Sequence, residues 1–147
     1  MLSFPLVKSQ TLLFERYGVE EGLSSSKVYS IIQDKRDHVW LGTESGASMF
    51  NGSKFINYST INGLAPGGVC SIFEDSLGRI WFGHLNGGIS LFDGKNFRRI
   101  RIDSIRIESD VTSIRQYDNY LWLTTSGDGA FRENIPEKSD TVLKGKQ

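Results

Sequence analysis

The segment GRIWFGHLNGGISLFDG, residues 78–94, places a tryptophan in an apolar run, then a cluster of glycines, then an Asp-Gly pair after a phenylalanine. A similar segment, DHVWLGTESGASMFNG, occupies residues 37–52. Two copies of one pattern in a 147-residue chain indicate an internal repeat. Repeats of this kind decide the fold of the proteins that carry them.

The tryptophans show the period of this repeat most clearly. Trp40, Trp81 and Trp122 follow one another at intervals of 41 residues. An interval of 41 or 42 residues also separates three further sets of matching positions: Val28, Val69 and Val111; Ser30, Ser71 and Ser113; Phe14, Phe55 and Phe97. A period of this size indicates one supersecondary unit copied along the chain.

Each unit is predicted to form four short antiparallel strands. Between residues 28 and 59, the runs VYSIIQD, HVWLGT, ASMF and KFINYS are separated by polar or glycine-bearing turns. Asn51-Gly52 and Asp93-Gly94 fall at matching places before the fourth strand, where we expect type I′ hairpin turns. Gly52 and Gly94 are therefore predicted to be structural residues.

Apolar residues stand next to one another in the inner strands, as in Ile31-Ile32 and Trp81-Phe82, which indicates sheets covered on both faces. A four-stranded sheet that repeats about every 40 residues and is covered by its neighbours is a β-propeller blade. The three tryptophans are then expected to fill the space between blades. The glycines are expected to let strands and loops pass closely.

The predicted fold is all-β, a partial β-propeller built of about three four-stranded antiparallel blades plus an extra N-terminal outer strand. Residues 11–23 are assigned to the outer strand and the loop after it, 24–64 to blade 1, 65–106 to blade 2, and 107–147 to a divergent blade 3. Three blades cannot close a ring, because closed propellers have roughly four to eight. Either the remaining blades of a longer chain complete it, or copies self-associate into a homo-oligomer.

Composition excludes several classes of partner. The chain has 17 basic and 17 acidic residues, so it lacks the long-range positive field that recruits nucleic acid or an anionic membrane. We expect no membrane insertion in this segment, and no signal peptide is visible in MLSFPLV. The single cysteine, Cys70, cannot form an internal disulfide and leaves the redox compartment open.

Ligands of propellers usually meet the face where the loops surround the central channel. The candidate ligand-binding residues on this face are Ser25, Lys27, Thr43, Glu44, His84, Asn86, Thr125 and Asp128. Thr43, His84 and Thr125 share one repeat position, three residues after each tryptophan, and this position varies while its neighbours hold. Such variation is expected where residues determine ligand specificity. Loop residues that only contact solvent would give the same pattern.

No residues are predicted to be catalytic, and no metal or cofactor is expected. Cys70 matches Tyr29 and Thr112 on the inner strand, so it is interpreted as a packed thiol rather than a nucleophile. His38 and His84 are expected on opposite rims, too far apart for a metal pair. An enzyme of the propeller lyase type would need a histidine and an acid at the channel mouth, for which His84 with Glu44 is the candidate pair.

The two complete units resemble a known family. GLSSSKVYSIIQDKRDHVWLGTESGASMFNGSKF and GLAPGGVCSIFEDSLGRIWFGHLNGGISLFDGKNF are similar to the two-component regulator propeller repeat of bacterial hybrid two-component systems. The third unit lacks the Gly-Leu opening and has Thr124 where the repeat usually has glycine. The resemblance implies a periplasmic sensor module that binds a ligand, commonly an oligosaccharide, without catalysis of its own. A histidine kinase activity would then lie outside this segment.

Three hypotheses about function therefore stand at this point. The chain is a ligand-sensing module, a protein-interaction module that completes a propeller by oligomerisation, or a lyase-type enzyme.

Overall fold

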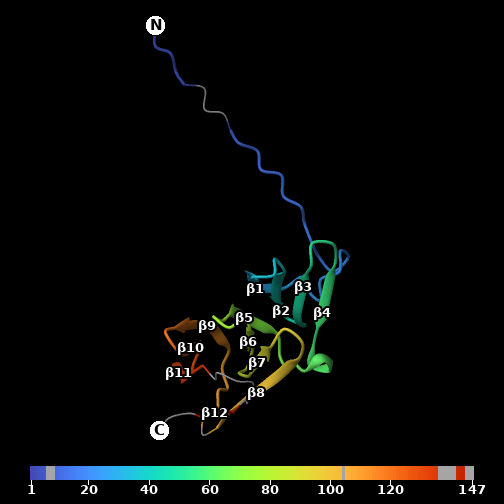
Figure 1. Cartoon of the computed structure of the whole chain (residues 1–147). Helices are drawn as coiled ribbons and strands as arrows, with labels where there is room; N and C mark the ends of the chain where they lie inside the picture. The colour runs from blue at the N-terminus through green and yellow to red at the C-terminus, as the bar shows by residue number, and fades with distance from the viewer. Residues whose placement is uncertain (6–8, 104, 136–141, 145–147) are drawn as a thin grey trace.

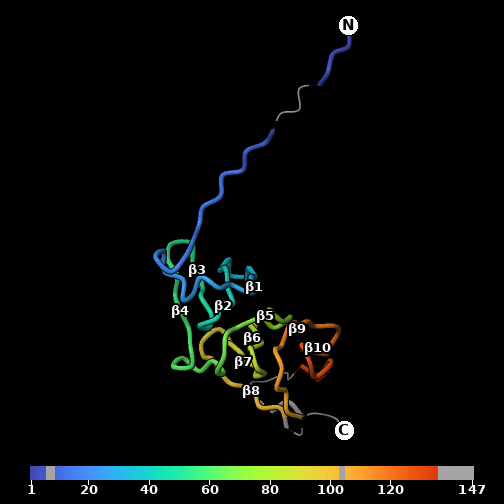
Figure 2. The backbone as a smooth tube through the Cα atoms, turned by 180° about the vertical axis from the view of Figure 1, so that it is seen from behind, coloured from blue at the N-terminus to red at the C-terminus, as the bar shows by residue number. Residues whose placement is uncertain are grey.

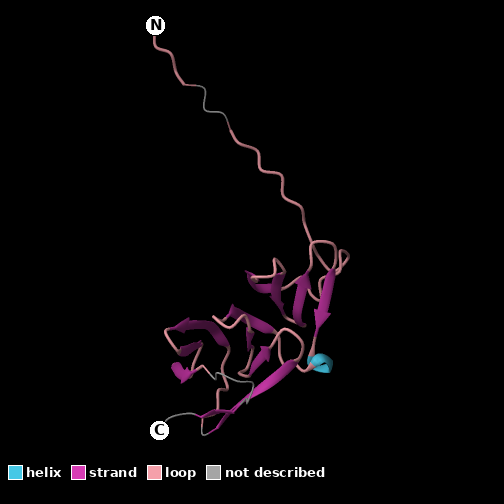
Figure 3. Ribbon diagram, in the orientation of Figure 1, coloured by secondary structure: helices cyan, strands magenta, loops and turns pink. Residues whose placement is uncertain are grey.

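The structure is a computed structural model that describes residues 1–5, 9–103, 105–135 and 142–144. Strands make up nearly all of its regular structure, and a single 3-10 turn, Thr60–Asn62, follows β4 (Figure 3). Three sheets lie side by side in chain order (Figure 1). This arrangement confirms the predicted all-β partial propeller.

The first two sheets are blades with the same strand order. Blade 1 consists of β1 (Val28–Gln33), β2 (Val39–Thr43), β3 (Gly46–Phe50) and β4 (Phe55–Tyr58). Blade 2 repeats it with β5 (Val69–Glu74), β6 (Ile80–His84), β7 (Ile89–Phe92) and β8 (Phe97–Asp103). All neighbours among these eight strands pair antiparallel, and the register of each pair matches between the two blades.

Within the described residues, the third blade has three strands rather than the expected four. It contains β9 (Val111–Tyr117), β10 (Tyr120–Thr125) and β11 (Ala130–Asn134). The next described strand, β12 (Val142–Lys144), pairs in parallel with β8 and so joins the sheet of blade 2. The physical reason lies in the sequence after β11, which has no Asn-Gly or Asp-Gly pair to turn the chain back beside it.

The extra N-terminal outer strand is likewise not formed. Residues 9–18 hold no strand, and the described part of this segment runs away from the blades (Figures 1 and 2). An outer strand needs backbone hydrogen bonds to the edge of a sheet, and residues 9–18 pair with none of the described strands, although the Tyr17 ring contacts Phe50 and Phe55 of blade 1. Phe14 is consequently 88% exposed.

The tryptophans behave as predicted in two of the three repeats. Trp40 and Trp81 are fully buried, and each projects from its own blade into the next one. Trp40 packs against Phe82, with 5.6 Å between the ring centres, and Trp81 packs in the cluster that contains Val111. Trp122 is 41% exposed, which corrects the prediction for blade 3, because no further blade among the described residues covers it.

Glycines permit the close contacts between blades. A Cβ atom on Gly83, in β6, would lie 2.7 Å from Cγ1 of Val111 in blade 3. A Cβ atom on Gly42, the matching residue of β2, would lie 2.8 Å from Cγ1 of Val69 in blade 2. Both separations are shorter than a carbon–carbon contact allows, so any side chain is excluded at this position in blades 1 and 2.

The hairpin turns differ in type from the prediction. Gly52 and Gly94 are the first central residues of their turns and have positive φ angles of 90° and 95°, but Ser53 and Lys95 after them do not, which fits a type II′ rather than a type I′ turn. The preceding side chain stabilises the turn instead. Asn51 Oδ1 accepts hydrogen bonds from the amides of Ser53 and Lys54, and Asp93 Oδ1 accepts the matching pair in blade 2. Gly52 and Gly94 keep their predicted structural role.

Candidate functional site

The candidate site is the rim, defined here as the loops that precede β1, β5 and β9 together with the loops β2–β3, β6–β7 and β10–β11. One backbone hydrogen bond joins the two loops of each blade. The amide of Glu44 donates to the Lys27 carbonyl at 3.1 Å, and the amide of Leu85 donates to the Gly68 carbonyl at 2.9 Å. Ser126 repeats the contact in blade 3, so the rim has the same framework in all three blades.

Thr43 lies inside blade 1 and has no exposed surface. Its Oγ1 atom is 2.8 Å from the hydroxyl of Ser24 and donates to the Gly46 carbonyl at 3.1 Å. The Ser24 hydroxyl is also 2.9 Å from that of Ser48. Thr43 therefore fixes the rim from within, and a ligand in the surrounding solvent cannot contact it in this conformation.

His84, at the same repeat position in blade 2, is also fully buried. Its Nδ1 lies 3.2 Å from the Gly67 carbonyl and its Nε2 lies 2.9 Å from the Ser90 hydroxyl. A carbonyl only accepts, so Nδ1 carries the proton and Nε2 accepts from Ser90. Burial lowers the pKa of His84, and the nearby Arg99 also lowers it, while the Gly67 carbonyl acts in the opposite direction.

Acid is expected to destabilise the protein through His84. Its folded pKa lies below the unfolded value of about 6.5, so the unfolded state binds the additional proton as the pH falls below that value. The loss of unfolding free energy reaches about 1.4 kcal/mol by pH 5.5 if His84 stays neutral. Melting temperatures measured between pH 7.5 and 5.5 should fall less steeply for His84→Gln than for wild type. Equal slopes would contradict a buried neutral His84.

In blade 3, Thr125 and Asp128 order the loops instead of lying free. Thr125 Oγ1 donates to the Gly129 carbonyl and accepts from the Asp128 amide, both at 2.8 Å. The Asp128 carboxylate accepts from the Ser109 hydroxyl at 2.7 Å and from the amides of Glu108 and Ser109. These hydrogen bonds lower the pKa of Asp128, so it is ionised at neutral pH.

The other four candidate residues present polar groups at the surface of the rim. Lys27 and Glu44 form an exposed ion pair with 2.7 Å between Nζ and Oε1, and this contact raises the pKa of Lys27. Ser25 accepts a hydrogen bond from the Lys27 amide at 3.1 Å. Asn86 has a φ of 59° and its amide donates to Asp110. The structure thus joins Ser25, Lys27 and Glu44 into one group, apart from Asn86.

A pocket opens in the rim beside Glu44. Its lining combines hydroxyl groups with apolar surface, from Glu44, Ser45, Ser59, Thr60, Leu64 and Ala65. Ser59 and Thr60 come from the 3-10 turn after β4, where the Ser59 side chain caps the turn. Sequence reasoning missed these residues because they lie outside the repeated rim positions.

A groove on the inner strands is a second possible binding site that the sequence analysis did not predict. Residues from β1, β5 and β9 line it together, among them Tyr29, Ile31, Cys70, Phe73, Thr112 and Arg115. Tyr29, Cys70 and Thr112 share one repeat position, which was the available signal. In the geometry of a propeller, this groove is a segment of the wall of the central channel.

The chemistry of the site offers no acid–base pair. His84 uses both ring nitrogens in hydrogen bonds to Gly67 and Ser90, and the Glu44 carboxylate is paired with Lys27. Burial raises the pKa of Cys70 to about 11, so its sulfur is a thiol at neutral pH. Among the described residues, no three His, Cys, Asp or Glu side chains gather as a metal site would require.

Two aspartates that the candidate set omitted anchor the tryptophans. Asp34 Oδ2 accepts a hydrogen bond from Trp40 Nε1, and Asp75 Oδ2 accepts one from Trp81 Nε1, both at 2.8 Å. Each aspartate also accepts amide hydrogen bonds from the turn between the first two strands of its blade. In blade 3, Tyr117 takes this position, because Gln116 pairs with Leu121 as Glu74 pairs with Ile80.

Comparisons with known proteins agree with this architecture. Residues 22–45 and 63–86 match the family model described as the two component regulator propeller. The chain is similar to the extracellular domain of BT3049 from B. thetaiotaomicron, named as a hybrid two component system, with 25% identity and a TM-score of 0.71. The match covers 82% of this chain and 19% of that one.

A second solved structure, the extracellular domain of BT4673 from B. thetaiotaomicron, is named as a one component system. It gives a TM-score of 0.69 at 18% identity, over 90% of this chain and 17% of that one. The chain thus spans less than a fifth of the length of either domain. No curated protein matches it. In the part of the chain that the structure describes, no helix has the length and hydrophobicity to cross a membrane. The first two strands of blade 1 and of blade 2 thus match the repeat of the two component regulator propeller family.

Proposed function

We propose that this chain is a ligand-recognising part of an extracellular or periplasmic sensor in a bacterial two-component signalling protein. The observation that carries the proposal is the match of residues 22–45 in blade 1 and 63–86 in blade 2 to the two component regulator propeller. The similar solved structures are extracellular domains, and their names assign them to signalling systems. The role proposed here is recognition without catalysis.

The rim pocket beside Glu44 is the proposed contact point for the ligand. It offers the Glu44 carboxylate and the Ser45, Ser59 and Thr60 hydroxyl groups beside the apolar residues Leu64 and Ala65, which are 1% and 7% exposed. Polar groups that fix orientation beside apolar surface are typical of small-molecule sites. The Lys27–Glu44 pair leaves no excess charge at the pocket, so an uncharged oligosaccharide fits better than a sulfated one.

Saturation-transfer NMR with a panel of neutral and sulfated oligosaccharides tests this proposal on the 147-residue chain. We expect at least one neutral oligosaccharide to give a transfer signal that Glu44→Gln weakens. Glu20→Gln, at an exposed glutamate that does not line the pocket, serves as the matched control and should leave the signal unchanged. Absence of any transfer, or equal loss in both variants, would count against a glycan site at this pocket.

A further inference from the structure

Blade 3 ends in an open sheet edge. β11 pairs with β10 on one side, and within the described residues no strand pairs with its other side. Blades 1 and 2 both place a fourth strand at this point, and in each the strand begins with phenylalanine, Phe55 or Phe97. An unpaired edge is a template for another strand.

Residues 14–17 have the sequence of that missing strand. Phe14 lies 41 residues before Phe55, and FERY matches FINY of β4 at both aromatic positions. These residues form no strand in the single copy. They and β11 lie at opposite ends of the row of blades, so they cannot meet within one open copy (Figure 1).

Tyr17 already has the environment of a fourth-strand residue. Its ring lies 5.7 Å from that of Phe55 and 5.8 Å from that of Phe50, on the free side of blade 1. Its counterpart Tyr58 contacts Phe97, the next blade's equivalent of Phe55, with 4.7 Å between ring centres. The segment therefore docks on blade 1 as the outer strand of a preceding blade would.

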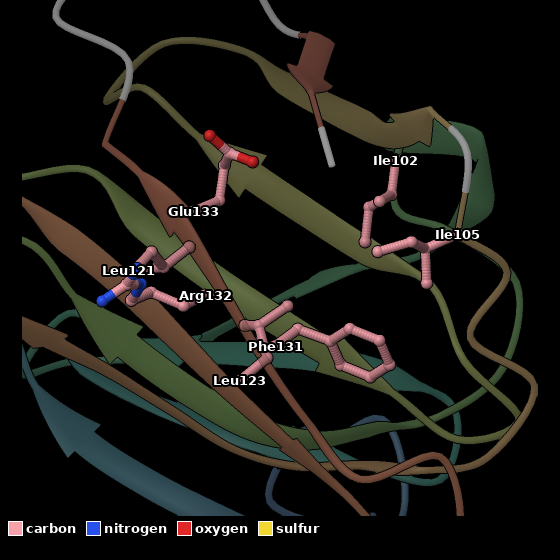
Figure 4. Close-up of a pocket in the computed structure, with 7 residues that line it drawn as sticks. All are labelled: Ile102, Ile105, Leu121, Leu123, Phe131, Arg132 and Glu133. Carbon is pink, nitrogen blue, oxygen red and sulfur yellow. The ribbon is translucent and has the colours of Figure 1, made fainter. Parts of the chain in front are cut away.

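A pocket beside β11 matches the side chain of Phe14. Phe97 packs against Phe82 and Phe92, whose equivalents in blade 3 are Leu123 and Glu133. Leu123 and Glu133 line this pocket together with Ile102, Leu121 and Phe131 (Figure 4). Successive strand residues face opposite sides, so Phe14 would enter the pocket while Tyr17 stays on blade 1.

The charges along the two segments are complementary. Trp40, Trp81 and Trp122 pair with Met49, Leu91 and Arg132 on the third strands. On the fourth strands, Ile56 pairs with Met49 and Arg98 pairs with Leu91. Ile56 directly follows Phe55 and Arg98 directly follows Phe97, as Glu15 follows Phe14. The register therefore puts Glu15 opposite Arg132. Arg16 is then diagonal to Glu133, within the reach of long side chains.

We propose that residues 14–17 of one copy pair antiparallel with β11 of a second copy as its fourth strand. Two copies that exchange these strands form a closed ring of six blades, within the range found for propellers. Trp122 then packs against Leu41, Phe50 and Phe55 of the other copy. These are the counterparts of Phe82, Phe92 and Phe97, which surround Trp40.

A charge exchange tests the pairing and its register. Glu15→Arg and Arg132→Glu each place like charges opposite one another in both interfaces of the pair. We expect each to raise the dissociation constant of the two-copy species about 10–100-fold in sedimentation velocity. An equimolar mixture of the two variants should associate as wild type does, because every pair in the mixed dimer is again of opposite charge.

Phe14→Asp and Phe4→Asp form a matched second test. Both phenylalanines are exposed in the single copy, at 88% and 84%, so neither substitution should alter the fold of the blades. Only Phe14→Asp is expected to abolish association. A monomeric wild type at all concentrations, equal effects of the two substitutions, or a mixture of charge variants that stays monomeric would overturn the proposal.

Discussion

Replacement of Trp40 by alanine is expected to lower the unfolding free energy by about 3–5 kcal/mol. The indole is fully buried and contacts Tyr58 of its own blade and Phe82 and Phe92 of the next, with ring centres 5.4–5.6 Å apart. Alanine would leave a cavity between two sheets that cannot move together without breaking other contacts. Chemical denaturation followed by far-UV circular dichroism measures the change.

Trp122→Ala provides the control within the same chain. This indole is 41% exposed and lies under Arg132, whose guanidinium carbon is 5.6 Å from the ring centre. We expect a loss of about 1 kcal/mol or less in the Phe14→Asp background, where copies do not associate. Equal losses from Trp40→Ala and Trp122→Ala would mean that Trp40 is not wedged between blades.

Asp75→Ala is expected to cost about 3–5 kcal/mol as well, through polar rather than apolar contacts. The buried carboxylate accepts from Arg79 Nε at 2.7 Å, from Trp81 Nε1 at 2.8 Å and from the amides of Leu77 and Arg79. Its removal takes the carboxylate partner from a buried arginine and from a buried indole at once. Thermal and urea denaturation should show the same large loss.

Asp34→Ala is the matched comparison in blade 1. Asp34 makes the same hydrogen bond to its tryptophan, but its basic neighbour is the partly exposed imidazole of His38 rather than a buried arginine. Burial acts to raise the pKa of Asp34, but the hydrogen bonds from Trp40, His38 and Arg36 outweigh it and lower the pKa. We expect a smaller loss, about 2 kcal/mol. A larger loss from Asp34→Ala than from Asp75→Ala would contradict the role given to Arg79.

The repeat made the blades predictable from the sequence. A tryptophan that recurs every 41 residues has to fill equivalent spaces, and Trp40 and Trp81 do so. The exposure of Trp122 depends on whether another blade packs against blade 3. The residues of the third unit alone do not determine this. The missing outer strand of blade 3 depends likewise on long-range pairing, since β12 finds the edge of β8 instead.

The candidate site was less predictable, because a repeat position can vary for two physical reasons. Its residues can contact a ligand, or they can contact different neighbours inside each blade. Thr43 and His84 are both buried but form hydrogen bonds with different partners, Ser24 in blade 1 and Gly67 in blade 2. Ser48 and Ser90 occupy one matching position on the third strands and take part in these hydrogen-bond networks. This recurring serine was the feature of the sequence that could have predicted the networks. The exposed group of Lys27 and Glu44 remains a prediction for ligand contact.

Hydrogen exchange of the three indole N–H groups, followed by NMR in the Phe14→Asp variant, tests the stacked-blade arrangement most directly. The account predicts slow exchange for Trp40 and Trp81, whose indoles are buried and donate to Asp34 and Asp75, and fast exchange for Trp122. Fast exchange at Trp40 or Trp81, or protection of Trp122 equal to theirs, would contradict it.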